Sequence, residues 1–314
     1  MESRTFFLDD SGHLRSGWRL AFFVVALLVC AKLLEVAVFV TASAIFRKSA
    51  VELLSGSWIY AVGGAVLFAS ATLVGWACGK LFEELPFSGL GWSFHSGWFR
   101  NFAIGSAIGD ASLFLAAVFA AVTRGLTFHL GQISAASIEK TLALSAIVFL
   151  ILAAAEEVVF RGYPLQTLTR AKLAWLGVML TSILFALLHL GNPNVARGFT
   201  FANTALAGVW LAIAYLRTRS LWFPFGIHWA WNWMQASIFG LPVSGIDQLA
   251  PAPLLHAMNK GPDWLTGGAY GIEGGAACTV ALLISTFVVW RTKLISSANV
   301  GTDRMDAGDT SNQA

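Results

Sequence analysis

Residues 141–162 read TLALSAIVFLILAAAEEVVFRG, an apolar run long enough to cross the hydrocarbon core of a bilayer. Runs of roughly 18–25 apolar residues recur along the whole chain. A soluble domain would carry about a quarter charged residues, but here 12% of the 314 residues are charged and 57% are hydrophobic. The sequence therefore predicts an integral membrane protein that contacts the lipid bilayer over most of its length.

Apolar runs separated by charged, Pro, Gly or Asn residues predict about eight transmembrane helices. They are expected at roughly 18–45, 58–81, 100–122, 141–162, 173–190, 199–216, 221–239 and 270–290. The expected fold class is all-α, a polytopic membrane helix bundle with a polar intramembrane cavity. Residues 1–17 are expected to form a cytoplasmic segment and 18–294 the transmembrane domain, with a motif core at 135–240. Residues 240–268 are expected to be a long loop, and 295–314, rich in Ser, Asp, Asn and Gly, a disordered tail.

The distribution of basic residues predicts the orientation of the chain. If the N-terminus lies inside, 13 of the 20 Lys and Arg fall in cytoplasmic segments, six fall outside and one lies within the first span. This bias predicts that both termini are cytoplasmic. The net charge of +3 gives no indication of a nucleic-acid partner. Cys30, Cys78 and Cys278 all lie in apolar runs and are expected to be buried hydrophobes rather than disulfides or metal ligands.

Two neighbouring acids, Glu156 and Glu157, lie near the end of the fourth apolar run. Adjacent residues of a helix point about 100° apart, so the two carboxylates cannot share one environment. Glu157 and Arg161 are four residues apart and are expected to form an ion pair. Glu156 then has no partner in sequence, and an unpaired carboxylate inside a membrane protein suits a general base. The alternative is that both acids mark a helix end while Arg161 reaches the headgroups.

Two further pairs of residues follow, one in the expected span at 173–190 and one in the expected span at 221–239. Phe185 and His189 share one helix face, as do His228 and Asn232. Singly, such a histidine or asparagine is commonly a polar contact between helices. Taken together, the side chains on three spans are obvious partners for one another, because buried polar groups need partners.

These residues resemble the EExxxR, FxxxH and HxxxN motifs of the CAAX-protease and bacteriocin-processing family of intramembrane proteases. The surrounding segments 189–194, 218–224 and 266–275 are similar to the bacterial branch of that family. The resemblance covers about 135–240, and it implies a multi-pass endopeptidase of the bacterial inner (plasma) membrane.

The resemblance also implies roles for individual residues. Glu156 and His189 match the residues that activate water, while His228 and Asn232 match those that stabilise the oxyanion. Glu157, Arg161 and Phe185 match supporting residues. The implied partner is a peptide or protein substrate, entering a cavity that opens toward the cytoplasm.

The metal requirement is left open by these residues. Glu156, His189 and His228 could together bind zinc. A metal-free glutamate mechanism is favoured, because using Glu156 as the base leaves only two imidazole ligands where three protein ligands are usual.

Two other functions fit the same residues. A non-catalytic scaffold or immunity protein of the same fold could bind a peptide without cutting it, and a proton-coupled transporter could use Glu156 and His189 as a relay. No internal repeat supports the transporter.

The proposed site also sets a geometric condition. If the fourth and fifth spans formed a straight antiparallel hairpin, Glu156 and His189 would lie at different depths in the membrane, so a bend near Gly162 and Pro164 is required.

Overall fold

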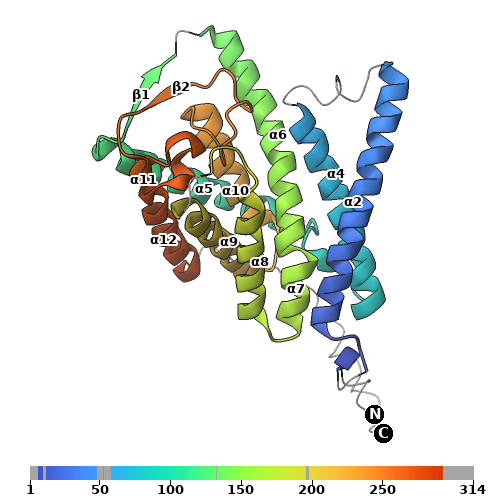
Figure 1. Cartoon of the computed structure of the whole chain (residues 1–314). Helices are drawn as coiled ribbons and strands as arrows, with labels where there is room; N and C mark the ends of the chain where they lie inside the picture. Colours follow the sequence, from blue (N-terminus) through green and yellow to red (C-terminus); the bar gives the residue numbers. More distant parts are fainter. Residues whose placement is uncertain are drawn as a thin grey trace.

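The computed structural model describes residues 6–9, 12–47, 52, 58–131, 133–195 and 198–292, so the expected tail at 295–314 lies outside the described residues. The described chain is a bundle of helices with one small sheet at one end (Figure 1). The main helices are α2 (Ser16–Phe46), α4 (Trp58–Glu83), α5 (Trp98–Val122), α6 (Ala135–Arg161), α7 (Tyr163–Arg170), α8 (Ala174–His189), α9 (Phe199–Thr218), α10 (Trp222–Trp233) and α12 (Ala276–Arg291). Each predicted span contains one of these helices, which confirms the all-α bundle.

The helices differ in their capacity to cross a membrane. Five segments are long and apolar enough, namely α2, α4, α5, α6 continued by α7, and α9. Helices α8 and α12 are apolar but have only 16 residues each. Helix α10 is shorter still and is prolonged by a π-helical turn at Met234–Ile238.

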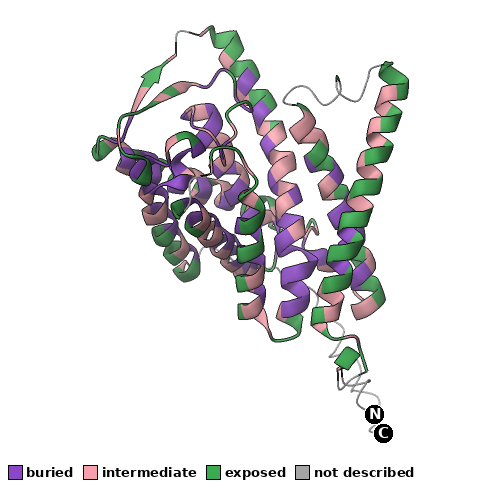
Figure 2. Cartoon of the chain, viewed as in Figure 1, coloured by how far each residue is buried: buried purple, intermediate pink, exposed green. Residues whose placement is uncertain are grey.

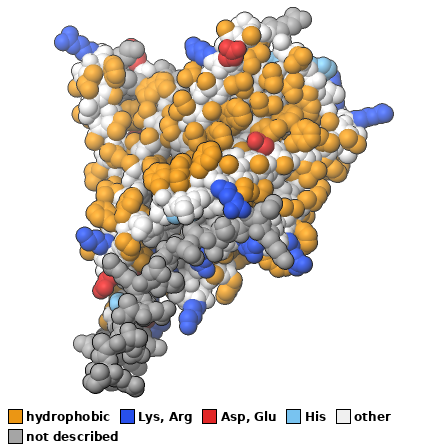
Figure 3. Space-filling view, turned by 180° about the vertical axis from the view of Figure 1, so that it is seen from behind, with side chains coloured by type: hydrophobic (Ala, Val, Ile, Leu, Met, Phe, Trp, Pro, Cys, Tyr) orange, Lys and Arg blue, Asp and Glu red, His pale blue; other side chains and the backbone are white. Residues whose placement is uncertain are grey.

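The apolar surface of the bundle agrees with a lipid environment. Helix α2 is exposed along much of its length, and the purple buried residues gather in the interior of the bundle (Figure 2). Hydrophobic side chains cover most of the face seen in Figure 3, while Lys and Arg gather toward its edges. Large exposed side chains such as Val25 at 62% and Leu28 at 66% would be unfavourable in water, and together they support a multi-pass membrane protein.

The helix is interrupted at Gly162, where α6 ends and α7 begins and where a bend is expected from the sequence. A Cβ at this position would collide with the carbonyl oxygen of Val158, so the backbone there accepts only glycine without rearrangement. Pro164 lies in the first turn of α7, where its missing N–H costs no helical hydrogen bond.

Glycines bring α5 and α10 into close backbone contact. Cβ atoms at Gly105 and Gly109 would collide with the carbonyl oxygens of Phe223 and Ile227, and one at Gly226 would collide with that of Phe102. Small residues at such spacing allow helices in a membrane to pack tightly. This contact fixes α10 in the bundle and, with it, the position of His228.

The prediction that residues 240–268 form a loop throughout is wrong in part. Strand β2 (Leu255–Asn259) lies within it and pairs antiparallel with β1 (Leu126–Leu130), with Leu126 opposite Asn259. A short helix, α11 (Asp263–Thr266), follows. The sheet lies at the end of the bundle away from the start of α2 (Figure 1). Five-residue strands joined across more than a hundred residues give too little local pattern to be recognised in sequence.

Candidate active site

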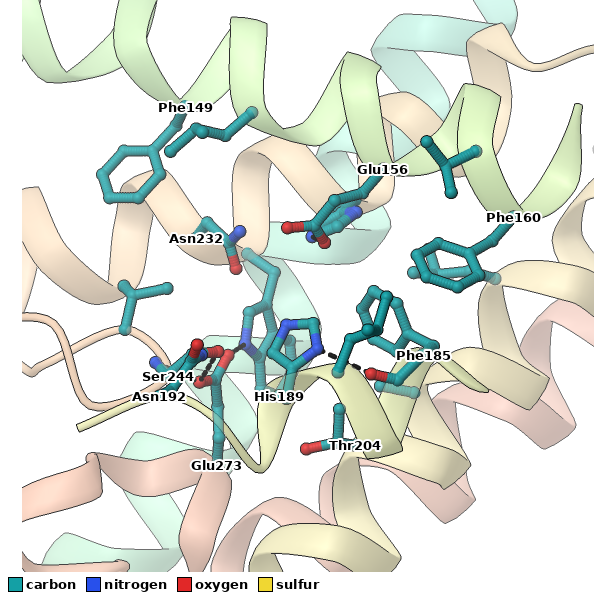
Figure 4. Close-up of a pocket in the computed structure, with 18 of the residues that line it drawn as sticks. Phe149, Glu156, Phe160, Phe185, His189, Asn192, Thr204, Asn232, Ser244 and Glu273 are labelled. Carbon is teal, nitrogen blue, oxygen red and sulfur yellow. Dashed lines mark hydrogen bonds and ion pairs between the residues drawn. The ribbon is translucent and has the colours of Figure 1, made fainter. Parts of the chain in front are cut away.

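The four residues predicted to be catalytic line one cavity of about 470 Å³. Glu156 comes from α6, His189 from the end of α8, and His228 and Asn232 from α10. In Figure 4 the labelled side chains of Glu156, His189 and Asn232 point into the same space. The rest of the wall is largely apolar and includes Phe149 and Leu152. The fold thus brings together the residues of all three motifs.

The predicted ion pair between Glu157 and Arg161 is present and fully buried. Arg161 Nη1 lies 3.1 Å from Glu157 Oε1, and both side chains are 0% exposed. Arg161 Nη2 also donates to the carbonyl oxygen of Gly208 on α9, at 3.2 Å. Glu157 Oε2 and Arg161 Nε are buried atoms without a hydrogen-bond partner among the described residues. Through the contact with Gly208, the pair joins α6 to α9.

His228 is held by the same carboxylate. Its Nδ1 lies 2.8 Å from Glu157 Oε1, and because an ionised carboxylate only accepts, Nδ1–H is the donor. The other ring nitrogen, Nε2, lies 3.5 Å from Glu156 Oε2. Glu157 thus fixes the orientation of the imidazole and directs Nε2 toward Glu156.

Glu156 and Glu157 occupy different environments, as predicted. The Glu156 side chain is 28% exposed, whereas that of Glu157 is fully buried. Glu156 Oε2 is a buried atom without a hydrogen-bond partner among the described residues. Beside the cavity, this oxygen therefore has an unsatisfied hydrogen-bonding position, which a donor from a bound molecule would satisfy.

His189 is oriented by its own helix. Its Nδ1 donates to the carbonyl oxygen of Phe185 at 2.7 Å, which leaves Nε2 free of that bond. The Phe185 ring lies 4.4 Å from the His189 ring and 6.2 Å from the His228 ring, centroid to centroid. On its other side Phe185 lies 4.8 Å from the Arg161 guanidinium. Phe185 therefore packs between both histidines and the buried arginine.

Glu273 is a second cavity carboxylate, which sequence reasoning noted only as part of the resemblance. Its Oε1 accepts from Trp231 Nε1 at 3.2 Å, and its Oε2 accepts from the backbone N–H and the hydroxyl of Ser244 at 2.6 and 2.9 Å. Burial and, second, the nearby Glu273 carboxylate raise the pKa of the Tyr270 phenol to about 12, so that Tyr270 stays neutral. Glu273 thus connects Trp231, the residue before Asn232, with the loop around Ser244, which lines the cavity (Figure 4).

Further polar residues line the cavity that no motif identified. Asn192 follows α8, and Asn203 and Thr204 lie in the first turns of α9. Asn203 Nδ2 donates to the carbonyl oxygens of Glu273 and Gly275 at 2.8 and 2.9 Å. In sequence these residues resemble ordinary helix-start or loop residues, and only the folded chain brings them to the cavity.

Glu156, His189 and His228, the residues that could together bind zinc, do not form a group of three ligands in this structure. No group of three His, Cys, Asp or Glu side chains in the described part of the chain could hold a metal ion. His228 and His189 each use Nδ1 for a hydrogen bond within the protein, which leaves Nε2 of each ring without that bond, an arrangement that metal-ligating histidines share. The preference for a metal-free mechanism therefore stays a prediction.

Comparison with known proteins identifies this part of the chain. Neither the curated proteins nor the solved structures give a significant match. Residues 137–234 match the family model described as type II CAAX prenyl endopeptidase Rce1-like. That segment contains Glu156, Glu157, Arg161, Phe185, His189, His228 and Asn232. Residues 137–234 are therefore an Rce1-like CAAX prenyl endopeptidase domain within a multi-pass membrane protein.

Proposed function

We propose that this chain is an intramembrane endopeptidase that hydrolyses an internal peptide bond of a peptide or protein substrate with Glu156 as the general base. One observation supports this most directly: Glu156 Oε2 lacks a hydrogen-bond partner among the described residues and lies 3.5 Å from His228 Nε2, at a cavity that His189 and Asn232 also line. The Rce1-like domain supports endopeptidase chemistry in general.

The first step is the attack of water on the scissile carbonyl carbon. Glu156 takes one proton from the water, the oxygen–hydrogen bond breaks, and a carbon–oxygen bond forms. His189 directs the water through Nε2, because its Nδ1 is committed to the Phe185 carbonyl oxygen. The carbonyl π electrons move to oxygen and give a tetrahedral oxyanion.

The oxyanion is stabilised by groups of α10. The Asn232 carboxamide lies one helical turn beyond His228 and supplies N–H donors. When its ring carries both protons, His228 donates from Nε2 as well. In the oxyanion hole of a serine protease, one fixed donor at the developing charge contributes about 2.7–4 kcal/mol. The Arg161–Glu157–His228 chain holds the imidazole in place throughout.

The tetrahedral intermediate then collapses. The oxyanion electrons re-form the carbonyl, the carbon–nitrogen bond breaks, and Glu156 delivers its proton to the departing nitrogen. The products are a carboxylic acid and an amine, and Glu156 returns to its ionised form. All atoms come from water and the peptide, so this sequence requires no further reactant.

The test is cleavage by purified protein in detergent. A farnesylated CAAX peptide and a mixture of unprenylated quenched peptides serve as probes, each measured with and without a chelator and beside elemental analysis of the sample. Glu156→Gln is expected to lower cleavage by about 100- to 10,000-fold without changing thermal unfolding. Glu139→Gln, an exposed acid on the same helix, is the matched control.

The outcomes separate the three functions. Wild-type cleavage that is lost in Glu156→Gln supports the endopeptidase. Peptide binding by both proteins without any cleavage would select the scaffold. Uptake that depends on a proton gradient, again without cleavage, would select the transporter.

A further inference from the structure

The two ends of the helix bundle differ in charge. The end at which α2 begins and α12 ends is here called the basic end. Among the described residues it carries nine Lys and Arg beyond the buried Arg161, whereas the opposite end carries four. Those of the basic end are Arg15, Arg19, Lys80, Arg100, Arg170, Lys172, Arg217, Arg219 and Arg291, and those of the opposite end are Arg47, Arg124, Lys140 and Lys260. The small sheet β1–β2 lies at the opposite end (Figure 1). Basic residues at short loops mark the cytoplasmic face of a membrane protein.

The bundle is closed between the cavity and the basic end. Glu83 at the end of α4 accepts from Arg19 of α2 at 2.9 Å and from Arg170 of α7 at 2.9 and 3.0 Å. The side chain of Glu83 is only 6% exposed. Above this cluster the rings of Phe23 and Tyr163 lie 5.6 Å apart, and Tyr163 is 1% exposed. Helices α2, α4 and α7 are therefore bound together below Glu156.

A second set of contacts closes the same end on the side of α10. Gln166 Nε2 on α7 donates to the carbonyl oxygen of Leu90 at 3.0 Å. The backbone N–H of Leu221 donates to the carbonyl oxygen of Gly91 at 3.0 Å. Leu90 and Gln166 are 4% and 2% exposed. The loop before α5 thus seals the space between α7 and α10.

The cavity wall continues instead toward the opposite end. Its polar residues there are Asn192 after α8, Asn203 and Thr204 at the start of α9, Ser244, and Glu273 before α12. These segments all belong to connections or helix ends on the side of the sheet (Figure 1). Figure 4 shows Asn192, Ser244 and Glu273 grouped next to His189.

The cavity also has exposed walls on α2 and α8. Leu28 and Leu188 both line it and are 66% and 67% exposed. Neither residue belongs to the sealed end formed by Glu83, Gln166 and Tyr163. A chain segment can therefore approach Glu156 past these two leucines or past the polar group near Ser244.

We infer that the cavity receives its substrate from the membrane face opposite the basic end, which the distribution of Lys and Arg makes the extracytoplasmic face. The substrate class is a polypeptide segment exposed at that outer face, from a membrane-anchored or secreted protein, rather than a cytoplasmic carboxyl terminus. The inference rests on the proposed endopeptidase for the identity of the bound molecule. It also reverses the expectation that the cavity opens toward the cytoplasm, because α7 and the Glu83 cluster lie on that side.

The orientation is tested by cysteine labelling in intact bacterial cells. Ser88→Cys lies in an exposed turn of the basic end, Ala136→Cys in the exposed first turn of α6 at the opposite end, and Asn192→Cys at the cavity. A membrane-impermeant maleimide added to intact cells is expected to label Ala136→Cys and Asn192→Cys, and to label Ser88→Cys only after permeabilisation. The wild-type chain, whose three cysteines lie within helices, gives the background.

Two labelling results would overturn the inference. Labelling of Ser88→Cys in intact cells would reverse the orientation, and labelling of Asn192→Cys only after permeabilisation would place the cavity on the cytoplasmic side. Adding Glu156→Gln to each variant is expected to leave the labelling unchanged, since the readout does not depend on catalysis.

The side of cleavage is tested with sealed vesicles and the quenched peptides used above. Peptide added outside right-side-out vesicles is expected to be cleaved at least ten times faster than peptide added outside inside-out vesicles. The reverse ratio, with cleavage in detergent intact, would refute the side of entry but leave the endopeptidase standing. Absence of cleavage in detergent would refute the endopeptidase, and the labelling would still report the orientation.

Discussion

Glu157 accepts from His228 Nδ1 at 2.8 Å with the same oxygen, Oε1, that Arg161 approaches at 3.1 Å. One carboxylate oxygen therefore joins a fully buried cation to an imidazole on another helix. The catalytic geometry proposed for α10 depends on a residue of α6 that does not itself contact the cavity.

Removing one member of the buried pair is expected to destabilise the protein strongly. Arg161→Met leaves Glu157 buried without its cation, at a cost of about 3–5 kcal/mol. The double variant with Glu157→Gln should recover part of that stability, because no uncompensated charge remains, but its cleavage should stay low since His228 loses its anionic partner. Thermal unfolding in detergent and cleavage rates measure the two effects. Equal stability of single and double variants would contradict the pairing.

Phe185→Leu is expected to affect both histidines. The ring packs against His189 at 4.4 Å and under Arg161 at 4.8 Å, and a leucine fills less of that space. We expect a loss of about 1–3 kcal/mol and a fall in kcat larger than the rise in KM, because the histidines shift while the cavity wall remains. Leu184→Ala, an exposed neighbour on α8, is the control. Unchanged kcat in a folded Phe185→Leu protein would refute the positioning role.

Gly162→Ala tests the break between α6 and α7. Its Cβ would collide with the Val158 carbonyl oxygen, whereas a Cβ at Gly63 on α4 meets nothing within 4 Å. Gly162→Ala should therefore lower stability by more than about 1 kcal/mol and reduce cleavage, while Gly63→Ala should be neutral or slightly stabilising. Unfolding midpoints of the two variants make the comparison, and similar midpoints would argue against a required glycine at 162.

Glu273→Ala tests the contact between α10 and the loop around Ser244, which lines the cavity. The variant loses acceptors for Trp231 and for both donors of Ser244, and hydrogen bonds to charged groups contribute about 1.5–3 kcal/mol each. We expect a rise in KM that exceeds the fall in kcat, since the loop loosens while Glu156 keeps its place. Ser244→Ala should show the same direction with a smaller size. A pure loss of kcat would instead point to a chemical role for Glu273.

The sequence predicted the bundle and the motif geometry because both depend on short-range patterns. Apolar runs define the helices, and a four-residue spacing places Glu157 beside Arg161 whatever surrounds them. A depth mismatch between Glu156 and His189 predicted a bend near Gly162, and the structure interrupts the helix at that residue. The different surroundings of the two adjacent acids followed in the same way from helix geometry.

The rest depends on contacts between distant segments. Glu273 accepts hydrogen bonds from Trp231 and Ser244, which lie 42 and 29 residues away in sequence, and no local sequence pattern predicts such contacts. The sheet of β1 and β2 joins Leu126 to Asn259 for the same reason. The side on which the cavity is closed is set by Glu83, Arg19 and Arg170, which come from three helices. The roles of the site residues stay predictions until cleavage is measured.

The burial of Arg161 has a consequence for which bonds can be cut. Among the described residues that line the cavity, Glu156 and Glu273 are acidic and none is Lys or Arg, while the guanidinium of Arg161 is 0% exposed and engaged by Glu157. A free chain-end carboxylate placed beside Glu156 would face like charge with no Lys or Arg of the described lining to offset it. For the proposed endopeptidase, we expect this charge pattern to disfavour trimming from a carboxyl terminus one residue at a time and to favour cleavage at a site set back from the end of the chain.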